Sequence, residues 1–406
     1  MMWYAGIDWA DQHHDVAVID EQGKQIAKQR VPHTVEGLAD LIAFLKATGD
    51  VAQHPDHLAC ILETNKGLLI TTLLEAGLLV YPVNPKTLEK WRKPSGAKTD
   101  AIDAFLLARK GRSDLDQLRR LEPDSSLVQE LKQLTRDQDG LIQMQTRLVN
   151  QLTACLKAYY PVALDLFALL QQPTTLAFLQ AFPTLEAARQ ASVAEIAALL
   201  RRSKHPQPET KAHWIVEQVQ HPQLQADAIT KRTKSRLLLA VVAQLASVVE
   251  TIAAYDKEIA RLFLTHPDAA MFANLPGAGK RIAPRLLAEW GDDRTRYQDA
   301  SSVQALAGSS PVAFQSGKFA KAHRRYACNK VLRNTLHQFA WQSTRAEPWA
   351  LAYYQRKRAE GKTHSVALRA LANLWVRILY AAWLHHRSYD AQRFLAARAA
   401  HAPRAA

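Results

Sequence analysis

Two carboxylates, Asp100 and Asp103, stand three residues apart in the stretch GAKTDAIDAFLLARKGR, which otherwise has the composition of a helix. Positions i and i+3 share one face of a helix, so these like charges would lie side by side and repel each other. Two more acids follow apolar residues that predict strands, Asp8 in WYAGIDW and Glu63 in HLACILET. Four carboxylates that converge from three elements are stable together when Mg²⁺ or Mn²⁺ neutralises them, since hard divalent cations take oxygen ligands.

Each of these acids also has a purely structural explanation. Asp8 could cap a turn after its strand, and Asp100 suits the first turn of a helix, where the helix dipole favours negative charge. Asp11 and Asp15 are rival acids near Asp8. It is the set of four, in this order of elements, that predicts a site for paired metal ions about 4 Å apart, which hold the attacking and leaving oxygens in phosphoryl transfer.

Ser316 is a candidate nucleophile in the stretch PVAFQSGKFAKAHRRYACNKVLRNTL. A serine hydroxyl attacks a phosphodiester only when it is activated and the developing charge is stabilised. The cations near it in sequence suit such stabilisation, and they are Lys318, Lys321, Arg324, Arg325, Lys330 and Arg333. His323 has no evident carboxylate nearby in sequence to orient it, so we infer no Ser-His-Asp triad. Residue chemistry alone leaves Ser309 and Ser310 as rivals of Ser316.

A glycine-rich turn, PGAG, precedes a predicted helix in the stretch NLPGAGKRIAPRLLAEWGD. Gly277 and Gly279 would expose backbone N–H groups and let a phosphate approach the helix N-terminus, with Lys280 and Arg281 directly behind. The pattern resembles a helix-hairpin-helix turn, which grips the DNA backbone without reading its sequence. Lys98, just before the acidic helix, is a further residue predicted to contact nucleic acid.

Positive charge is concentrated in the last third of the chain. The protein has 406 residues and a net charge of +14, and residues 271–406 hold 22 Lys and Arg against 7 Asp and Glu. Such a bias is typical of a protein that binds a polyanion, most often nucleic acid. We interpret these residues as a mostly α-helical C-terminal domain.

Other features of the composition indicate a cytoplasmic protein. No uninterrupted apolar run approaches the roughly 18 residues of a membrane helix. The N-terminus lacks the basic and apolar regions of a secretion signal. The three cysteines are far apart and have no metal-ligand spacing, which favours a reducing compartment.

The elements predicted around the acids form an α/β domain, which we place at residues 1–122. Three strands come first, within residues 3–32, and helices then alternate with strands up to the acidic helix. This is the order of an RNase H-like sheet. His13 and His14 lack a metal-ligand spacing and are expected at the surface.

Residues 123–270 predict a helical spacer. Apolar residues recur at alternating spacings of three and four in two stretches, 127–155 and 241–262, which is the seam of a coiled coil. Gln138 and Gln145 fall on the first seam and would weaken it or fix its register. Between the seams, helical sequence with Pro-rich breaks predicts a small insertion at the tip of the spacer. We interpret the whole region only as a spacer and dimer surface.

These motifs together resemble those of the transposases of the bacterial insertion-sequence-110 family, also called DEDD transposases, and of the related Piv-type DNA invertases. The resemblance covers nearly the whole chain and rests on the segments YAGIDWADQHHDVAVID, LETNKG, VNPKTLEKWRKPSGAKTDAIDAFLLAR, LPGAGKRIAPRLLAEWGD, and AGSSPVAFQSGK with CNKVLRNTL. Three segments depart from the family pattern: Asn65 and Lys66 replace Thr-Gly, GSSP replaces Gly-Leu-x-Pro, and Cys328 replaces the glycine before Asn329. None of them removes a proposed catalytic group.

The resemblance implies a serine recombinase built on a RuvC-like domain. Its four metal ligands would be Asp8, Glu63, Asp100 and Asp103, and Ser316 would attack a phosphodiester and form a transient phosphoserine link to DNA. The protein would act as a homo-oligomer, a dimer or a tetramer, on double-stranded donor and target DNA at the bacterial nucleoid. A structured bridge RNA would pair with both DNAs, so that base pairing chooses the sequence.

Two alternatives stay open. In a RuvC-like nuclease or Holliday-junction resolvase, water would attack the phosphodiester and Ser316 would be idle. In a decayed nucleic-acid binder, no catalysis would take place. The four intact acids argue against the decayed binder, and the QSG loop favours the recombinase over the nuclease.

Overall fold

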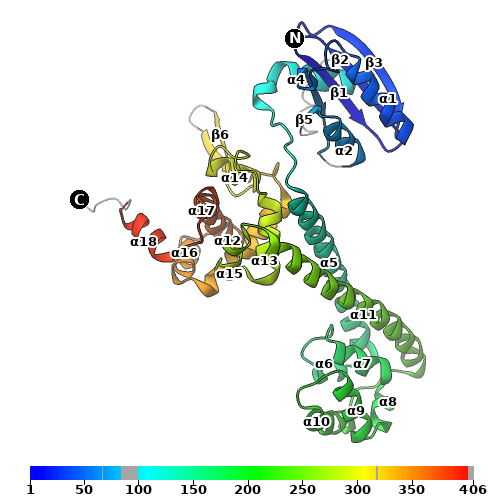
Figure 1. Ribbon diagram of the computed structural model, residues 1–406. Coiled ribbons are helices and arrows are strands. Elements are labelled where there is room, and N and C mark those ends of the chain that lie inside the picture. The colour runs from blue at the N-terminus through cyan, green and yellow to red at the C-terminus, as the bar shows by residue number, and fades with distance from the viewer. Residues whose placement is uncertain (66, 84–98, 317–318, 401–406) are drawn as a thin grey trace. The chain divides into compact units, whose positions relative to one another are not determined.

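The computed structural model describes residues 1–65, 67–83, 99–316 and 319–400. The chain divides into two compact units, Met1–Pro123 and Asp124–Ala406. The first unit is an α/β domain and the second is mostly helical (Figure 1). Two predicted nucleic-acid contacts, Lys98 and Lys318, lie outside the described residues.

A five-stranded sheet forms the centre of the first unit. Its strands are β1 (Trp3–Trp9), β2 (His13–Ile19), β3 (Gln25–Pro32), β4 (Leu58–Leu62) and β5 (Leu79–Pro82), in the spatial order β3-β2-β1-β4-β5. β2 pairs antiparallel with β1 and β3, whereas β4 is parallel to both β1 and β5. The RNase H-like order predicted from the sequence is confirmed by this topology.

Helices cover both faces of the sheet, because alternate residues of a strand point to opposite faces. The helices are α1 (Val35–Lys46), α2 (Leu68–Glu75) and α4 (Asp100–Asp114), with 3₁₀ turns η1 (Pro55–His57) and η2 (Leu115–Gln117). Ala5 and Ile7 of β1 belong to the core that α1 and α2 cover. Tyr4 and Gly6 face α4 on the other side. The helix that carries the two acids therefore lies on the face to which Asp8 belongs.

α4 crosses β1 directly over Gly6. A Cβ atom on Gly6 would lie 1.9 Å from the carbonyl oxygen of Ala104 and 2.4 Å from the backbone nitrogen of Ala108. Backbone atoms cannot rotate away, so Gly6→Ala must displace α4 from the sheet. We expect this variant to unfold at least about 5 °C below the wild type in calorimetry, because overpacking a core costs roughly 1–3 kcal/mol.

Gly140, in the long helix α5 (Ser126–Tyr159), is the matched control for this substitution. A Cβ atom there meets nothing within 4 Å, and alanine is favoured over glycine inside a helix by roughly 0.5–1 kcal/mol. Gly140→Ala should therefore leave the unfolding temperature unchanged or raise it slightly. If Gly6→Ala behaves in the same way, the close contact between α4 and β1 is wrong.

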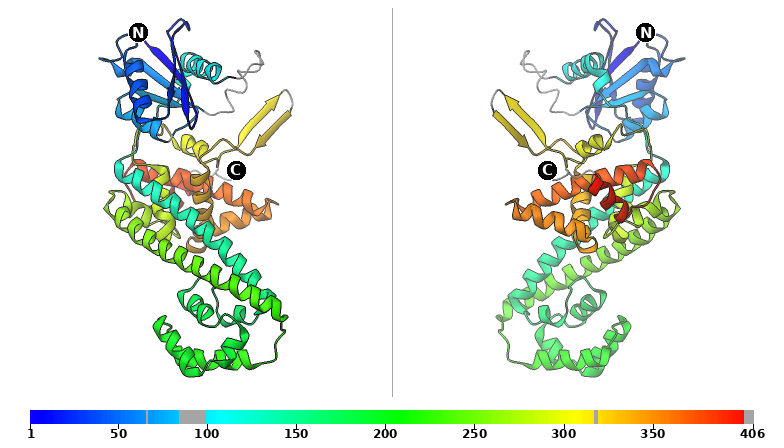
Figure 2. Two further views of the ribbon diagram at one scale, coloured as in Figure 1. Left: turned by 90° about the vertical axis from the view of Figure 1, so that its right-hand side faces the viewer. Right: turned by 90° about the vertical axis from the view of Figure 1, so that its left-hand side faces the viewer.

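Two long helices, α5 and α11 (Ala228–Thr265), pack along each other in the second unit (Figure 2). Buried residues on the predicted seams include Leu131, Leu148, Leu152 and Cys155 of α5 and Val241, Leu245, Val248, Ile252, Ile259 and Leu262 of α11. Gln138 is also buried on the seam, where its amide donates to Asp256 Oδ1 at 2.8 Å. This hydrogen bond sets the register of α5 relative to α11.

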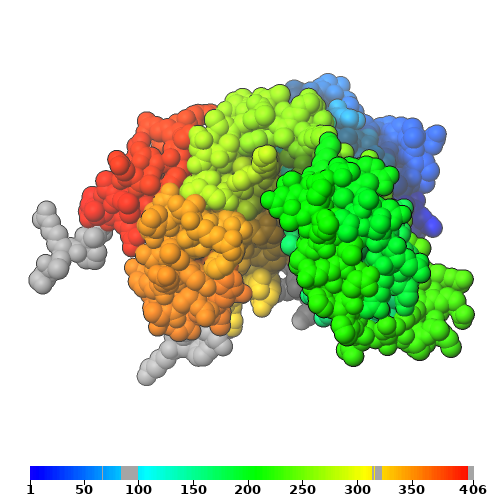
Figure 3. Space-filling model, turned by 90° about the horizontal axis from the view of Figure 1, so that it is seen from below, coloured from blue at the N-terminus to red at the C-terminus, as the bar shows by residue number. Residues whose placement is uncertain are grey.

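Five short helices connect the far ends of α5 and α11. They are α6 (Ala163–Leu166), α7 (Pro173–Ala181), α8 (Leu185–Gln190), α9 (Val193–Arg202) and α10 (Pro208–Gln220). Together with the adjoining ends of the long helices they bury a core that includes Tyr160, Phe178 and Ile215. These helices lie where the sequence predicts an insertion, and Figure 3 views the molecule from their end.

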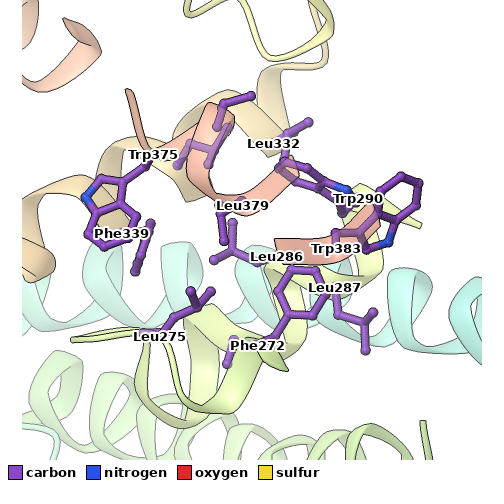
Figure 4. Packing of buried hydrophobic residues seen from close by; sticks show 14 of the residues in the cluster. Phe272, Leu275, Leu286, Leu287, Trp290, Leu332, Phe339, Trp375, Leu379 and Trp383 are labelled. Atoms are coloured by element: carbon purple, nitrogen blue, oxygen red, sulfur yellow. The ribbon is translucent and has the colours of Figure 1, made fainter. Parts of the chain in front are cut away.

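The rest of the second unit packs around a core rich in tryptophan. Its elements are α12 (Ala269–Ala273), α13 (Gly279–Trp290), α14 (Ala300–Leu306), β6 (Val312–Ser316), β7 (Phe319–His323), α15 (Lys330–Ala346), α16 (Pro348–Ala359), α17 (His364–Leu384) and α18 (Ala391–Ala400). Trp290, Trp375 and Trp383 are fully buried and belong to one cluster with Phe272 and Phe339 (Figure 4). The predicted boundary at residues 270 and 271 falls inside α12, and the division into three domains stays a prediction.

Two helices, α11 and α17, are long and apolar enough to cross a membrane by length and composition alone. The test tolerates polar residues within the helix, so it does not contradict the expectation that no uninterrupted apolar run approaches 18 residues. Core helices of soluble proteins pass the same test, and both helices contribute buried residues to the cores of the second unit.

Candidate active site

Asp8 and Glu63 stand at the same end of two neighbouring parallel strands. Ile7 of β1 pairs with Leu62 of β4, so the next residue of each chain segment, Asp8 or Glu63, lies at the same level. Neighbouring strands are about 4.8 Å apart. Ile61, two residues before Glu63, packs in the core that α4 covers. By strand alternation, Asp8 and Glu63 therefore belong to the face of α4.

α4 brings Asp100 and Asp103 to the same edge of the sheet. The helix runs opposite to β1, because Gly111 near its end lies beside Tyr4 at the start of the strand. Its first turn, which contains the two acids, consequently lies at the end of β1 that carries Asp8. Asp103 is buried at 3% exposure, whereas the side chain of Asp100 is 52% exposed.

The first turn of α4 is fixed by a local cap. The hydroxyl of Thr99 accepts a hydrogen bond from the backbone N–H of Ile102 at 3.3 Å, the usual role of threonine at this position. Negative charge in the first turn is stabilised by the helix dipole. The structural explanation of Asp100 and Asp103 thus holds alongside the functional one, and the two do not exclude each other.

A further acid and a histidine lie at this edge. His13 Nε2 lies 3.5 Å from Asp100 Oδ2 and 4.0 Å from Asp15 Oδ2. Arg30 donates to both oxygens of Asp15, the shortest bond being 2.7 Å, and its Nη2 lies 3.7 Å from Asp100. The hydrogen bonds to Asp15 raise the pKa of Arg30. Arg30 therefore supplies positive charge to the carboxylates at the edge.

The donor set at this edge fits a hard divalent cation. Ligand atoms of His13, Asp15 and Asp100 all lie within 4.8 Å of one another, and carboxylate oxygens are the ligands that Mg²⁺ and Mn²⁺ prefer. Among the described residues one other such group exists, in the turn at residues 54–57, and neither group contains Asp8, Glu63 or Asp103. That the four predicted acids share one metal site stays a prediction.

Sequence reasoning missed His13 and misplaced His14. Strand alternation was the available signal, because it puts His13 on the same face of β2 as Asp15, which pairs with Asp8. His14 faces the other way and is fully buried, with Nε2 2.8 Å from Nδ1 of His33. Its burial lowers its pKa to about 4. The expectation that His14 lies at the surface is therefore wrong.

Ser316 is the last residue of β6, at the tip of a β-hairpin. β6 and β7 pair antiparallel, with Ser316 opposite Phe319 and Val312 opposite His323. The backbone thus places Ser316 at the end of its strand, next to the turn. Lys321 is in β7 of the same hairpin.

Asn329, six residues after the end of β7, is the N-terminal cap of α15. Its side-chain oxygen caps α15 by accepting from the backbone N–H groups of Val331 and Leu332 at 3.0 and 3.1 Å. Its Nδ2 donates to Glu289 at 2.7 Å, and this buried carboxylate also accepts two hydrogen bonds from Arg136 of α5. One asparagine therefore joins the start of α15 to Glu289 of α13, which also binds the long helix α5.

Asn329→Ala should loosen this anchor. The variant loses a helix cap, worth about 1 kcal/mol, and leaves the buried carboxylate of Glu289 with one donor fewer, which costs about 1–3 kcal/mol. We expect a lower thermal unfolding midpoint and faster amide hydrogen exchange in the first turn of α15. Asn334→Ala, an exposed change on the same helix, should do neither, and equal behaviour of the two variants would contradict the anchor.

The PGAG turn has mixed support as a phosphate grip. Gly277 and Gly279 both have positive φ, +80° and +59°. A Cβ atom on Gly277 would lie 2.8 Å from the backbone of Gln342, so this glycine is required for packing, whereas Gly279 meets nothing within 4 Å. Arg281 donates twice to Asp256, at 2.7 and 3.0 Å, which occupies its guanidinium and raises its pKa. Lys280 borders a cavity of about 510 Å³ beside the turn.

Two family models match the chain. Residues 5–161 match a transposase model for the IS110 type of DEDD transposases. Residues 269–355 match the model described as the transposase IS116/IS110/IS902 family. The first match includes all four predicted metal ligands, and the second includes the PGAG turn, the hairpin and α15.

Individual relatives extend over nearly the whole chain. A mini-circle protein of Streptomyces coelicolor, described as a transposase for IS117, is 32% identical over 97% of this chain and 96% of its own. The 42 kDa protein of insertion element IS900 from Mycobacterium paratuberculosis is 28% identical over 95% and 96%. The pilin gene-inverting protein of Moraxella bovis is 28% identical over 35% of this chain and 46% of its own.

A solved structure also shows a likeness to part of the chain. RuvC of T. thermophilus, in complex with a Holliday junction substrate, matches with a TM-score of 0.23 and 14% identity, over 30% of this chain and all of that one.

Proposed function

This chain belongs to the IS116/IS110/IS902 family of transposases, and from that premise we propose that it cuts and rejoins DNA strands through a phosphoserine intermediate at Ser316. The observation that carries the proposal is the register of β1 and β4, which aligns Asp8 with Glu63 at the edge where α4 begins. A serine on a hairpin tip and an acidic edge are the two parts that such chemistry needs.

The acidic edge is the proposed metal site. Asp8, Glu63, Asp100 and Asp103 would hold Mg²⁺, or Mn²⁺ in its place. A bound ion there would polarise a phosphate oxygen and offset the negative charge that develops during phosphoryl transfer.

Ser316 is the proposed nucleophile. Its Oγ would form a bond to the phosphorus atom while the bond from phosphorus to the strand's leaving oxygen breaks, and the serine proton would pass to that oxygen through solvent. The hydroxyl of the second strand would then attack the phosphoserine, which rejoins the DNA and restores the serine. Each step exchanges one phosphoester for another, so no external energy source is required.

The remaining partners follow from the same proposal. The basic C-terminal region would bind donor and target DNA, and a bridge RNA would choose the sequences by base pairing. The protein would act as a dimer or a tetramer, with α5 and α11 as a coiled-coil spacer and contact surface. The acidic edge and Ser316 would together form one composite active site. The two parts would come from one subunit or from two.

A metal-dependent nuclease or Holliday-junction resolvase is the second candidate. The acidic edge is compatible with it, because water could attack the phosphodiester in place of Ser316. The two candidates differ in whether DNA becomes covalently attached to the protein.

A covalent trap decides between them. The protein is mixed with Mg²⁺, RNA transcribed from the flank of its own element, and labelled donor and target DNA, then denatured and digested. We expect label on the peptide that contains Ser316. Cleaved DNA with no labelled protein would contradict the recombinase and favour the nuclease.

A further inference from the structure

Three arginines from three segments of the second unit surround His337. Arg333 and His337 lie four residues apart on one face of α15. Arg369 comes from α17, which packs against α15, and Arg324 follows β7 directly. Burial, followed by the charges of Arg369, Arg333 and Arg324, lowers the pKa of His337 to about 4. His337 is therefore neutral at pH 7, and among the described residues the charged groups that act on it are all basic.

No carboxylate balances this arginine cluster among the described residues. Nε2 of His337 and Nε of Arg369 are both buried and have no hydrogen-bond partner there. Burial, together with the charges of Arg324 and Arg333, lowers the pKa of Arg369 as well. Like charges held together and buried donors without acceptors destabilise a fold. An arrangement of this kind indicates that an anion completes it.

The cluster is built on a rigid frame. Asn373, one turn after Arg369 on α17, accepts a hydrogen bond from Ser309 on its side chain and one from Gln304 on its backbone, both at 2.9 Å. Nη1 of Arg333 lies 3.9 Å from the sulfur of Cys328. Cys328 in turn packs against Gly308, where a Cβ atom would lie 2.6 Å from that sulfur. These contacts hold the helices that carry Arg333 and Arg369 in place.

We infer that Arg324, Arg333 and Arg369, together with His337, bind one phosphate group of a DNA strand. Guanidinium groups match phosphate oxygens because they present forked N–H donors in one plane. A phosphate would supply the missing negative charge, and its oxygens would accept from the buried Nε of Arg369. The choice of DNA rests on the proposed function, since the cluster adjoins the hairpin that carries Ser316.

The position of the cluster defines what this phosphate contact would do. His323, next to Arg324, pairs with Val312 at the base of the hairpin, and Ser316 lies at the tip. Val312 and Ser316 are four residues apart in the strand, which corresponds to about 14 Å along it. The arginine cluster would therefore hold the backbone several nucleotides from the attacked phosphate. Its role is to set the register of the strand relative to Ser316.

The test compares two arginines of α17. Arg369→Gln should weaken binding of a labelled duplex DNA by about tenfold in fluorescence anisotropy, and lower the salt dependence of the logarithm of affinity by about 0.9. It should not lower the unfolding temperature, because it removes repulsion. Arg377→Gln has the same charge change two turns further along the helix, and it should bind nearly as the wild type does. Arg324→Gln, at an exposed residue, should repeat the loss without any risk to folding.

Each outcome bears on the inference separately from the proposed function. If Arg369→Gln and Arg324→Gln bind DNA as tightly as Arg377→Gln does, the arginine cluster does not bind phosphate, whatever the covalent trap shows. If they bind DNA normally but lose affinity for an RNA stem of equal length, the assignment to DNA is wrong. If DNA binding weakens as expected while no phosphoserine forms, the cluster stands and the recombinase mechanism fails.

Discussion

Ser316→Ala should abolish the covalent protein–DNA intermediate and reduce strand exchange by at least about 10³-fold, because removal of a covalent nucleophile leaves only the contribution of binding and charge stabilisation. DNA binding should be unchanged, since the hydroxyl contributes one polar atom among many cations. The measurement is the yield of labelled protein in the covalent trap, together with recombinant product after a fixed time.

Ser309 and Ser310 provide the controls for this prediction. Ser309 is buried at 7% exposure and donates to Asn373 at 2.9 Å, so its hydroxyl already has a structural role. Ser310→Ala should leave the adduct in place. Strand exchange that survives Ser316→Ala at wild-type rate would show that another group attacks the phosphodiester.

Asp103→Asn is the second substitution with a large expected effect. It removes a charge from a buried carboxylate at the edge where Asp8 and Glu63 are aligned, and changes its shape very little. We expect strand cleavage to fall by more than about 100-fold, since even indirect partners of a metal site are worth 10- to 100-fold. The affinity for Mn²⁺, measured by calorimetry without DNA, should fall in parallel.

A matched control comes from the second group of ligand-type residues in the same unit. Asp56→Asn alters the exposed group at residues 54–57 and should change neither Mn²⁺ binding nor cleavage. If Asp56→Asn removes Mn²⁺ binding and Asp103→Asn does not, the metal site is at the 3₁₀ turn and the acidic edge has been assigned wrongly. Loss of Mn²⁺ binding in Asp15→Asn would indicate that the metal site also includes Asp15 and its neighbour His13.

The strands of the first unit could be predicted because the burial of each strand is reflected in the apolar pattern of its own residues. Residues 5–7 and 58–62 are buried stretches of small and aliphatic residues, and the order of elements leaves few possible sheets. The register could not be predicted in this way. If β1 and β4 were shifted by one residue relative to each other, Asp8 and Glu63 would point to opposite faces of the sheet. Only the packed sheet excludes this shift.

The sequence by itself determined which residues are able to do chemistry. The acids, the serine in a polar stretch and the excess of cations after residue 270 are properties of composition and spacing, and the matches to transposase models cover the same stretches. It also predicted two helices with apolar seams that must be buried, whereas only the tertiary structure showed that α5 and α11 pack along each other.

Only the tertiary structure decided which of these groups have partners. Arg281 and Arg369 are equivalent in a count of charges, yet Arg281 is bound to Asp256 and Arg369 stands in a cluster without a described carboxylate. His13 and His14 are neighbours in sequence, but one lies beside Asp100 and the other is buried on the opposite face. The physical reason is that charge and hydrogen bonding act over a few ångströms in space, and the fold sets those distances between segments far apart in the chain.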